Sequence, residues 1–320
     1  MGKQPSFRPF PLFTGRHAQT ITASFLPFTR RLPSITRFVH LPDGERIAME
    51  VSTPKGWKES DPTVVMIHGL CGCHRSSYLV RMTRKLYRQG IRAIRVNLRG
   101  CGSGKEYGKK LYHADASEDM YLTLKEIQRD APHSPVTVVG FSLGGNIILK
   151  MAGEYEEKIE SLVTKIIAVN PPLDLGSSIA HLSKNRFYER YFMSALREEV
   201  TFRHETFEAL PPIRISPEMT LLEFDELYIA PQSGQENAAE YYQACSSGRL
   251  IHKITVPCHL LFARDDPIVD CHVLEGIDLP EQIEVLITEK GGHLGYLGMP
   301  GKEGGFHWMD GLLLRWISQH

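Results

Sequence analysis

The chain has 320 residues, enough for one large domain or two small ones with a sizeable core. Its 37 basic and 37 acidic side chains balance, which gives no electrostatic reason to expect a nucleic-acid partner. Six cysteines are too sparse for a disulfide scaffold at this length, so we expect reduced thiols and a cytoplasmic protein.

Neither a signal peptide nor a membrane span is expected. Residues Met1 to Pro5 lack an apolar core followed by a cleavage site. The longest apolar stretch, Val136 to Gly153, contains Asn146 and Lys150, and it is better explained as a strand, a turn and a helix than as a span.

Residues 5–33 are rich in proline and in aromatic side chains, namely Phe7, Phe10, Phe13, Phe25 and Phe28. This composition predicts an irregular arm packed on the core. A surface that touches lipid transiently is the alternative, and it stays open. Alternating residues on both sides of Pro42-Asp43-Gly44 then predict a hairpin of Ile35 to His40 with Arg46 to Ser52.

From Thr63 the pattern alternates between strand and helix. The expected strands are Thr63–His68, Ile91–Asn97, Val136–Gly140, Thr164–Asn170, Cys258–Ala263 and Glu284–Thr288. The expected helices run near Ser76–Gln89, Ser117–Arg129, Leu143–Ala152 and Phe306–Ser318, and Asp115 with Glu118 resembles a capping box for the second. Such alternation predicts a mostly parallel sheet with helices on both faces.

The most informative motif is Gly140-Phe141-Ser142-Leu143-Gly144, a G-x-S-x-G between a β-branched run and a helical pattern. A serine on so sharp a strand-to-helix turn has strained backbone angles and an exposed hydroxyl, and the two glycines remove side chains that would clash. We therefore predict that Ser142 is a nucleophile, which needs a histidine base and an acid.

The alternation breaks after the sixth strand, where residues 173–250 show amphipathic helix patterns without a clear strand. An insertion at this point falls over the active site, so we expect a helical cap that shapes the substrate pocket. The predicted organisation is a core of residues 1–172 with an arm over 1–34, a cap over 173–250, and the rest of the core over 251–320. We expect that several members of one set of cap side chains face Ser142 and line a pocket for an acyl chain; the alternative is that they are core residues of the cap itself. The set is Phe187, Tyr188, Tyr191, Phe192, Met193, Phe202 and Phe207.

The acid and the base should follow Ser142 in the order Asp or Glu, then His. Asp265 and Asp266 follow the strand that ends at Ala263, and the spacing to Val269 favours Asp266 as the acid, with Asp265 supporting the loop. His293 follows the last strand beside two glycines and is the predicted base. His272 is the nearest rival, but it lies only six residues past Asp266.

The strand Thr63–His68 ends in His-Gly, where an oxyanion hole takes one backbone N–H. We assign its donors to Leu70 and Leu143 and expect a structural role for His68. No metal site is expected, because Cys71-Gly72-Cys73 is too tight for zinc. Arg99 to Lys105 resembles a phosphate loop but lacks its glycine spacing, and a glycine-rich turn explains it.

These residues resemble the α/β-hydrolase superfamily and, within it, the YheT-like branch (the AB hydrolase 4 family). Several motifs carry the resemblance along nearly the whole chain: His17 to Ile21, Leu41 to Gly44, His68 to Leu70, Asn97 to Cys101, Gly140 to Asn146, Phe224-Asp225, Ala230-Pro231, Tyr241-Tyr242, Ala263 to Pro267 and Gly291 to His293. The branch usually has Gly-Ser where this chain has Gly72-Cys73, and Ile229 replaces a common threonine. The resemblance implies an α/β-hydrolase fold and a triad of Ser142, Asp266 and His293.

The family is described as esterases and lipases, with animal relatives acting on glycerolipids. The resemblance thus implies hydrolysis of a small or lipid-like carboxylic ester without a cofactor. An acyltransferase or thioesterase with the same triad and a non-catalytic ligand-binding protein are the alternatives. The physiological substrate, acyl-chain length, pathway and oligomeric state are not determined by the sequence.

Overall fold

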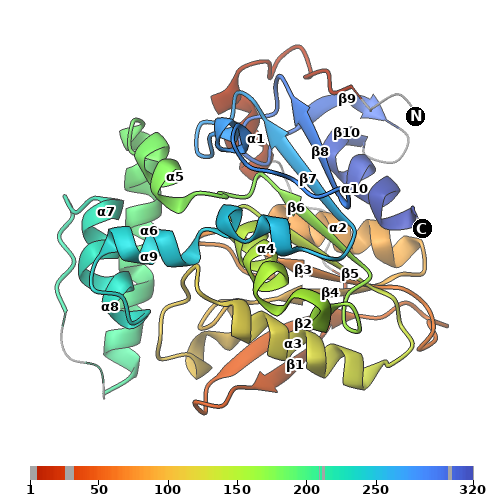
Figure 1. The fold of residues 1–320 in the computed structure, drawn as a ribbon, viewed down its shortest axis with the longest axis horizontal. Helices are drawn as coiled ribbons and strands as arrows, with labels where there is room; N and C mark the ends of the chain where they lie inside the picture. The colour runs from red at the N-terminus through yellow and green to blue at the C-terminus, as the bar shows by residue number, and fades with distance from the viewer. Residues whose placement is uncertain (1–5, 26–31, 209, 211–212, 302–304, 320) are drawn as a thin grey trace.

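A computed structural model describes residues 6–25, 32–208, 210, 213–301 and 305–319. Its main sheet has eight strands in the order β1-β2-β4-β3-β5-β6-β7-β8 (Figure 1). β1 and β2 form an antiparallel hairpin and β2 pairs antiparallel with β4, whereas all later neighbours are parallel. The strands are β1 (Ile35–His40), β2 (Arg46–Ser52), β3 (Thr63–Ile67), β4 (Arg92–Val96), β5 (Val136–Phe141), β6 (Lys165–Val169), β7 (Cys258–Ala263) and β8 (Ile283–Thr288).

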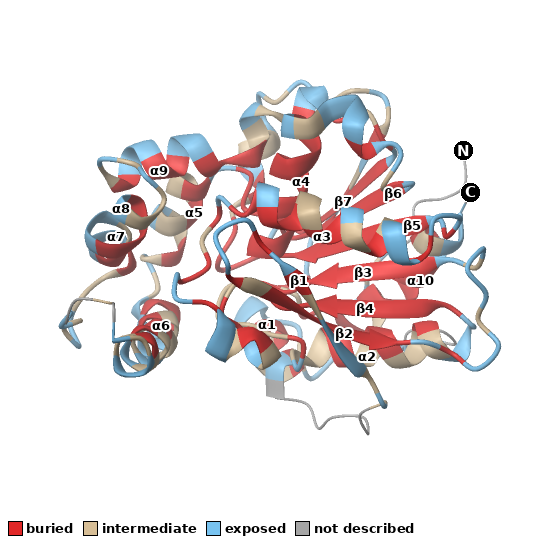
Figure 2. Ribbon diagram, turned by 90° about the horizontal axis from the view of Figure 1, so that it is seen from below, coloured by how far each residue is buried: buried red, intermediate tan, exposed pale blue. Residues whose placement is uncertain are grey.

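Helices cover both faces of this sheet, as Figure 2 shows by the buried strands between them. One face packs against α2 (Ser77–Arg88) and α10 (Trp308–Ser318), and the other against α3 (Ser117–Asp130) and α4 (Leu143–Tyr155). Because the central strands are buried on both faces, they are continuous apolar runs, as the sequence predicted. The expected α/β-hydrolase fold is confirmed.

Between β6 and β7 the chain leaves the sheet and forms a group of helices at one side of the molecule (Figure 1). These are α5 (Leu175–Leu182), α6 (Arg186–Thr206), α7 (Leu221–Phe224), α8 (Ala230–Gln232) and α9 (Ala238–Cys245). We call this group the cap. It lies within the predicted range 173–250 and follows the sixth strand, as expected, whereas the exact domain boundaries remain a prediction.

The apolar stretch Val136 to Gly153 is divided between β5 and α4, as predicted. Among the described helices, none is long and apolar enough to cross a membrane.

The N-terminal arm differs from the prediction, because Arg16–Phe25 forms helix α1 instead of an irregular segment. The buried amide of Gln19 holds this helix against the backbone of Leu297. Its Nε2 donates to the Leu297 carbonyl at 2.9 Å, and its Oε1 accepts from the Leu297 N–H at 2.6 Å. Pro9 also bridges Gly298. Phe28 lies outside the described residues.

Two further predictions near the ends of elements are wrong. The capping box of Asp115 and Glu118 does not form, because α3 begins at Ser117 after Ala116 without a side-chain cap, and the Asp115 carboxylate pairs with Lys150 at 2.7 Å. The helix predicted from Phe306 begins at Trp308, because Phe306 belongs to strand β10 (Gly305–His307). This strand pairs antiparallel with β9 (Leu297–Gly301), and the sequence analysis predicted neither strand.

Candidate active site

Ser142 occupies the sharp turn between β5 and α4. Its φ is +52°, a left-handed conformation that is strained for a residue with a side chain. A Cβ on Gly140 would lie 2.5 Å from the Gly144 carbonyl oxygen, and one on Gly144 would lie 2.5 Å from that of His68. Only glycines therefore allow this turn to close against β3, as the motif predicted.

The structure brings Ser142, His293 and Asp266 into one hydrogen-bonded chain. Ser142 Oγ lies 2.9 Å from His293 Nε2, and His293 Nδ1 lies 2.8 Å from Asp266 Oδ2. Because a carboxylate only accepts, Nδ1 carries the ring proton and Nε2 is left to accept from the serine hydroxyl. All three side chains are buried, with relative exposures of 9%, 8% and 3%.

Asp266 is held by more bonds than the one to histidine. Its Oδ1 accepts from the backbone N–H groups of Ile268 and Val269 at 2.7 and 3.0 Å. Asn170 Nδ2 donates to Oδ2 at 2.7 Å, and Tyr296 in turn donates its hydroxyl to Asn170. The buried charge thus has a partner on each oxygen. The sequence analysis missed this support, whose one signal was the asparagine at the end of β6.

Asp265 points to the loop that carries the histidine, since its Oδ1 accepts from the Gly292 N–H at 2.9 Å. Its neighbour Asp266, and not Asp265, contacts His293. His272 is an exposed residue of the 3-10 turn Cys271–Leu274, and it contacts Asp270 instead of Ser142.

Helix α1 supports the histidine loop directly. The backbone N–H of His293 donates to Thr20 Oγ1 at 2.9 Å. Gly292 has a φ of +58°, and a Cβ there would lie 2.5 Å from the Arg16 carbonyl oxygen. The sequence analysis noted His17 to Ile21 only as a matching motif, and the structural reason for the motif is this contact.

The loop after β3 lies against Ser142, because a Cβ on Gly69 would be 3.0 Å from the serine Cβ. His68 fixes this loop: its Nε2 accepts from the Leu98 N–H at 3.1 Å, so its Nδ1 donates to the Gly69 carbonyl at 2.8 Å. Burial lowers the pKa of His68 to about 4, which keeps the ring neutral and structural. Leu70 and Leu143, the predicted oxyanion donors, both line the cavity at Ser142.

Two hollow spaces meet at Ser142. The first, which we call the inner cavity, has a volume of about 100 Å³ and lies beneath the cap. Its lining is mainly apolar and includes Leu175, Ile179, Leu182, Phe192, Leu196, Phe224 and Ile268. The second, the outer pocket, has a volume of about 340 Å³. It is lined by α1, by residues 69–72 and 75–78, by His293 and Leu294, and by the cap residues Phe187, Tyr188, Tyr191 and Phe192.

The aromatic side chains of the cap divide between these spaces and other contacts. Phe192 lines both spaces, whereas Phe187, Tyr188 and Tyr191 line only the outer pocket. Met193 is buried on the other side of α6, and Phe202 stacks under the ammonium of Lys105. Four of the seven predicted side chains thus line a space at Ser142, Phe192 alone of the set lines the inner cavity, and Phe207 lines neither space.

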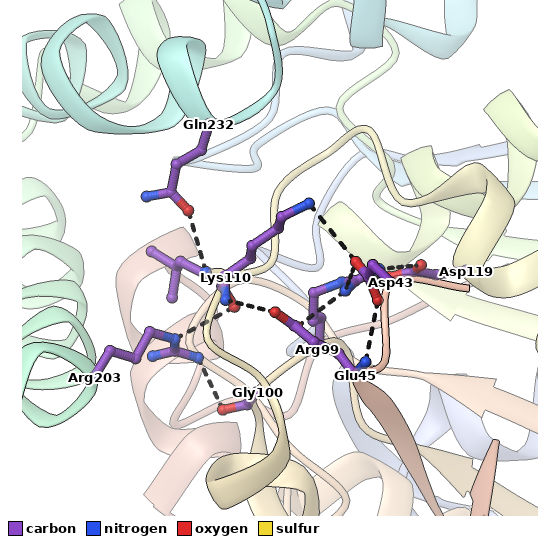
Figure 3. Close-up of polar contacts among 9 residues, drawn as sticks. Asp43, Glu45, Arg99, Gly100, Lys110, Asp119, Arg203 and Gln232 are labelled. Carbon is purple, nitrogen blue, oxygen red and sulfur yellow. Dashed lines mark hydrogen bonds and ion pairs between the residues drawn. The ribbon is translucent and has the colours of Figure 1, made fainter. Parts of the chain in front are cut away.

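A polar network ties the cap to the loop after β4 (Figure 3). The buried guanidinium of Arg203 donates to the carbonyls of Gly100 at 2.9 Å and Lys110 at 3.4 Å, and Gln232 accepts from the Leu111 N–H. A Cβ on Gly100 would lie 2.3 Å from Arg203 Nη2. The cap therefore packs directly on the glycine-rich segment after β4. This close contact explains the glycine at position 100 without a bound phosphate.

On the core side of the same network, Arg99 joins three carboxylates (Figure 3). Its guanidinium pairs with Asp43 at 2.7 Å, Glu45 at 2.9 Å and Asp119 at 2.7 Å. These partners raise the pKa of Arg99 further, so the cation stays charged despite its burial. The β1–β2 turn, the loop after β4 and α3 are thereby held together below the cap.

In the described part of the chain, Asp270, Cys271 and His272 are close enough to share a metal ion. None of the three lines the inner cavity or the outer pocket. Cys71 and Cys73 are free thiols, and burial raises the pKa of the Cys71 thiol to about 12, which makes it unreactive.

Comparison with known proteins places this geometry in a family context. The family described as "alpha/beta hydrolase fold" matches residues 62–209. YheT of Escherichia coli (strain K12), which is named as an esterase, is 28% identical to this chain. The match covers 91% of this chain and 87% of the YheT chain. A monoacylglycerol lipase of Saccharomyces cerevisiae is 30% identical over 74% of this chain but only 55% of its own. Esterase Pf2001 of Pyrococcus furiosus has the same fold, with a TM-score of 0.55, 15% identity, and coverage of 85% of this chain and 90% of its own.

Proposed function

Since the chain belongs to the α/β-hydrolase superfamily and resembles its YheT-like branch, we propose that it is a serine carboxylesterase with Ser142, His293 and Asp266 as its triad. The hydrogen-bonded chain from Ser142 Oγ through the His293 ring to Asp266 carries this proposal. Esterase and lipase names among the relatives support a hydrolase that acts on small ester substrates.

In the proposed reaction Ser142 Oγ attacks the ester carbonyl carbon while His293 Nε2 takes the hydroxyl proton. The carbonyl oxygen becomes an oxyanion, for which the N–H groups of Leu70 and Leu143 are the proposed donors. Leu143 is the first residue of α4, where unpaired N–H groups and the helix dipole favour a negative charge. His293 then gives its proton to the leaving alcohol, and a water molecule releases the acid from Ser142 by the reverse route.

The two spaces suggest how the ester lies. The leaving alcohol must be close to His293 to receive its proton, and His293 lines the outer pocket but not the inner cavity. We therefore assign the alcohol to the outer pocket and the acyl group to the inner cavity. The inner cavity has a volume of about 100 Å³ and a mainly apolar lining, which suits a short or medium acyl chain.

Covalent labelling tests the proposal. A fluorophosphonate should modify Ser142 once per chain, and Ser142→Ala should remove both the label and the hydrolysis of a panel of p-nitrophenyl esters. Mass spectrometry that locates the adduct on another residue, or finds none on folded protein, would refute the assignment. Ser24→Ala, an exposed serine of α1, is the matched control and should label like the parent.

Acyl transfer to an alcohol is the second candidate function. The width of the outer pocket favours it, because a space of about 340 Å³ beside His293 has room for an acceptor alcohol. Adding alcohols to the ester assay and measuring transesterification against hydrolysis separates the two. A cytoplasmic location stays a prediction of the sequence.

A further inference from the structure

The inner cavity contains a carboxyl group that the proposed reaction does not use. Asp225 lines the cavity from the cap, while Ser142 lines it from the sheet. Most of the other lining side chains are apolar, among them Leu221, Phe224 and Ile229 on either side of Asp225. A carboxyl group in such surroundings is costly unless it has a partner, so its presence calls for an explanation.

The backbone that carries Asp225 is unusual. Thr220 and Glu223 form a capping box that starts α7 at Leu221, and the chain then continues into a π turn over Asp225–Ile229. A π turn inserts an extra residue into a helix and is frequent at functional sites. Phe224, just before the turn, and Ile229, its last residue, are both buried, so the turn is anchored in the cap core.

Asp225 has one protein partner on its carboxyl group in the described residues, the hydroxyl of Tyr242, which donates to Oδ2 at 2.7 Å. Burial raises the pKa of Asp225 to about 7, and the Tyr242 bond offsets this only in part. No cation among the described residues forms an ion pair with it within 4 Å. One carboxyl oxygen therefore remains to accept from a molecule in the cavity.

The Tyr241 hydroxyl and the His113 ring line the same cavity, but neither forms a hydrogen bond with Asp225. The Tyr241 hydroxyl accepts from the Ala114 N–H at 2.8 Å. Burial lowers the pKa of His113, another lining residue, to about 4, so its ring is neutral. An ammonium group would have to lose its hydration in an apolar cavity, which is costly even when the charge is paired. A hydroxyl group loses much less and still donates to a carboxyl oxygen.

We propose that Asp225 is a specificity-determining residue that accepts a hydrogen bond from a hydroxyl group on the acyl chain, so that the preferred substrates are esters of hydroxyacyl acids. This inference rests on the proposed esterase function and on the assignment of the acyl group to the inner cavity. It names the substrate class: a short or medium acyl chain with an apolar body and a hydroxyl group beyond the ester carbon.

The test compares kcat/KM for p-nitrophenyl hexanoate, 3-hydroxyhexanoate and 6-hydroxyhexanoate in the parent and in variants. In the parent, one of the two hydroxy esters should be the best substrate. Asp225→Leu should lower the ratio of that ester to hexanoate by about tenfold or more, because the hydroxyl loses its acceptor.

Asp225→Asn keeps the shape and one acceptor, so its ratio should lie between those of the parent and Asp225→Leu. It also preserves the test if the leucine variant does not fold. Glu226→Gln is the matched control, since Glu226 is the exposed acidic neighbour and does not line the cavity. Its ratio should equal that of the parent.

Two negative outcomes are distinguishable. If hexanoate is hydrolysed through Ser142 but neither variant of Asp225 changes the ratio, this inference is refuted and the esterase function stands. If no ester is hydrolysed and Ser142 is not labelled, the proposed function fails and the inference fails with it.

Discussion

The inner cavity and the outer pocket share Ser142, but they are built from different parts of the chain. The inner cavity is closed by the cap, whose helices are tied to the core by Arg203, Gln232 and Tyr241. The outer pocket is closed by α1 from the N-terminal arm and by the exposed edge of α6, where Phe187 and Tyr191 are 60% and 57% exposed.

This difference indicates how selectivity is divided. A small apolar cavity with buried anchors rejects acyl groups that do not fit, because overfilling a packed space is unfavourable. A wide pocket with exposed walls accepts many alcohols. Polar contacts of Tyr188 join α6 to α1 beside this pocket, among them the contact of its hydroxyl with His17 Nδ1 at 2.9 Å. We therefore expect strict acyl selectivity and loose alcohol selectivity.

The largest expected effect removes the chemistry shared by both spaces. Asp266→Asn should lower kcat by about 10⁴-fold for every ester, because the His293 ring loses the acceptor that fixes its tautomer. Asp265→Asn is the control, since it retains an oxygen for the Gly292 N–H, and it should cost far less. A larger loss in the Asp265 variant would show that the acid is assigned to the wrong residue.

The second-largest expected effect is on the pH dependence of the free energy of unfolding, and it arises from Asp225 in the inner cavity. The pKa of Asp225 is raised from 3.8 to about 7 on folding, so its contribution to stability is present below pH 3.8 and is lost as the pH rises to about 7. Asp225→Asn avoids this loss of at most about 4 kcal/mol. The Tm of this variant relative to that of the parent should therefore rise between pH 5 and pH 8, and a constant Tm difference over this range would contradict the raised pKa of Asp225.

Acyl-chain length sharpens the contrast between the two spaces. Each methylene buried in the inner cavity contributes about 0.8 kcal/mol, so two more carbons should raise kcat/KM by about tenfold until the cavity is full. Ile179→Trp, on the cavity wall, should move the optimum to shorter chains. Tyr191→Ala, in the outer pocket, should leave the optimum unchanged. A flat profile from acetate to octanoate would place the acyl group elsewhere.

The smallest expected effect is on kcat and comes from α1 at the outer pocket. Thr20→Val keeps the size of the side chain but removes the acceptor for the His293 N–H, and kcat should fall by about fivefold to tenfold. Ser24→Ala is matched to it, because Ser24 makes the same bond to the helix carbonyl four residues back but does not touch the histidine loop. Equal kcat values in the two variants would mean that α1 does not position His293.

The elements of the core followed from local patterns. β-branched runs bounded by glycine and proline located the strands to within a residue or two, because a strand buried on both faces has to be apolar throughout. The turn at Ser142 was equally predictable from the sequence, because it needs glycines on both sides. A Cβ on Gly140 or on Gly144 would lie 2.5 Å from a backbone oxygen. The order of Asp266 and His293 after Ser142 indicated the remaining candidates.

Other features depended on contacts between residues far apart in the chain. The arm was predicted to be irregular because no local pattern shows that Gln19 bonds the backbone at Leu297 or that Thr20 meets His293. The local sequence predicted Asp115 as a helix cap, but in the fold its carboxylate pairs with Lys150, which lies 35 positions later in the chain. The support of Asp266 by Asn170 and Tyr296 likewise joins three separate segments.

The sequence by itself thus determined the fold class, the sharp turn at Ser142 and the candidates for acid and base, because each depends on backbone sterics and hydrophobic period within a few residues. The tertiary structure decided which aspartate contacts His293, how Arg203 seats the cap on Gly100, and that Asp225 opens into the inner cavity. These depend on the packing of the cap and α1 against the sheet, where the meeting residues are tens to hundreds of positions apart in the chain.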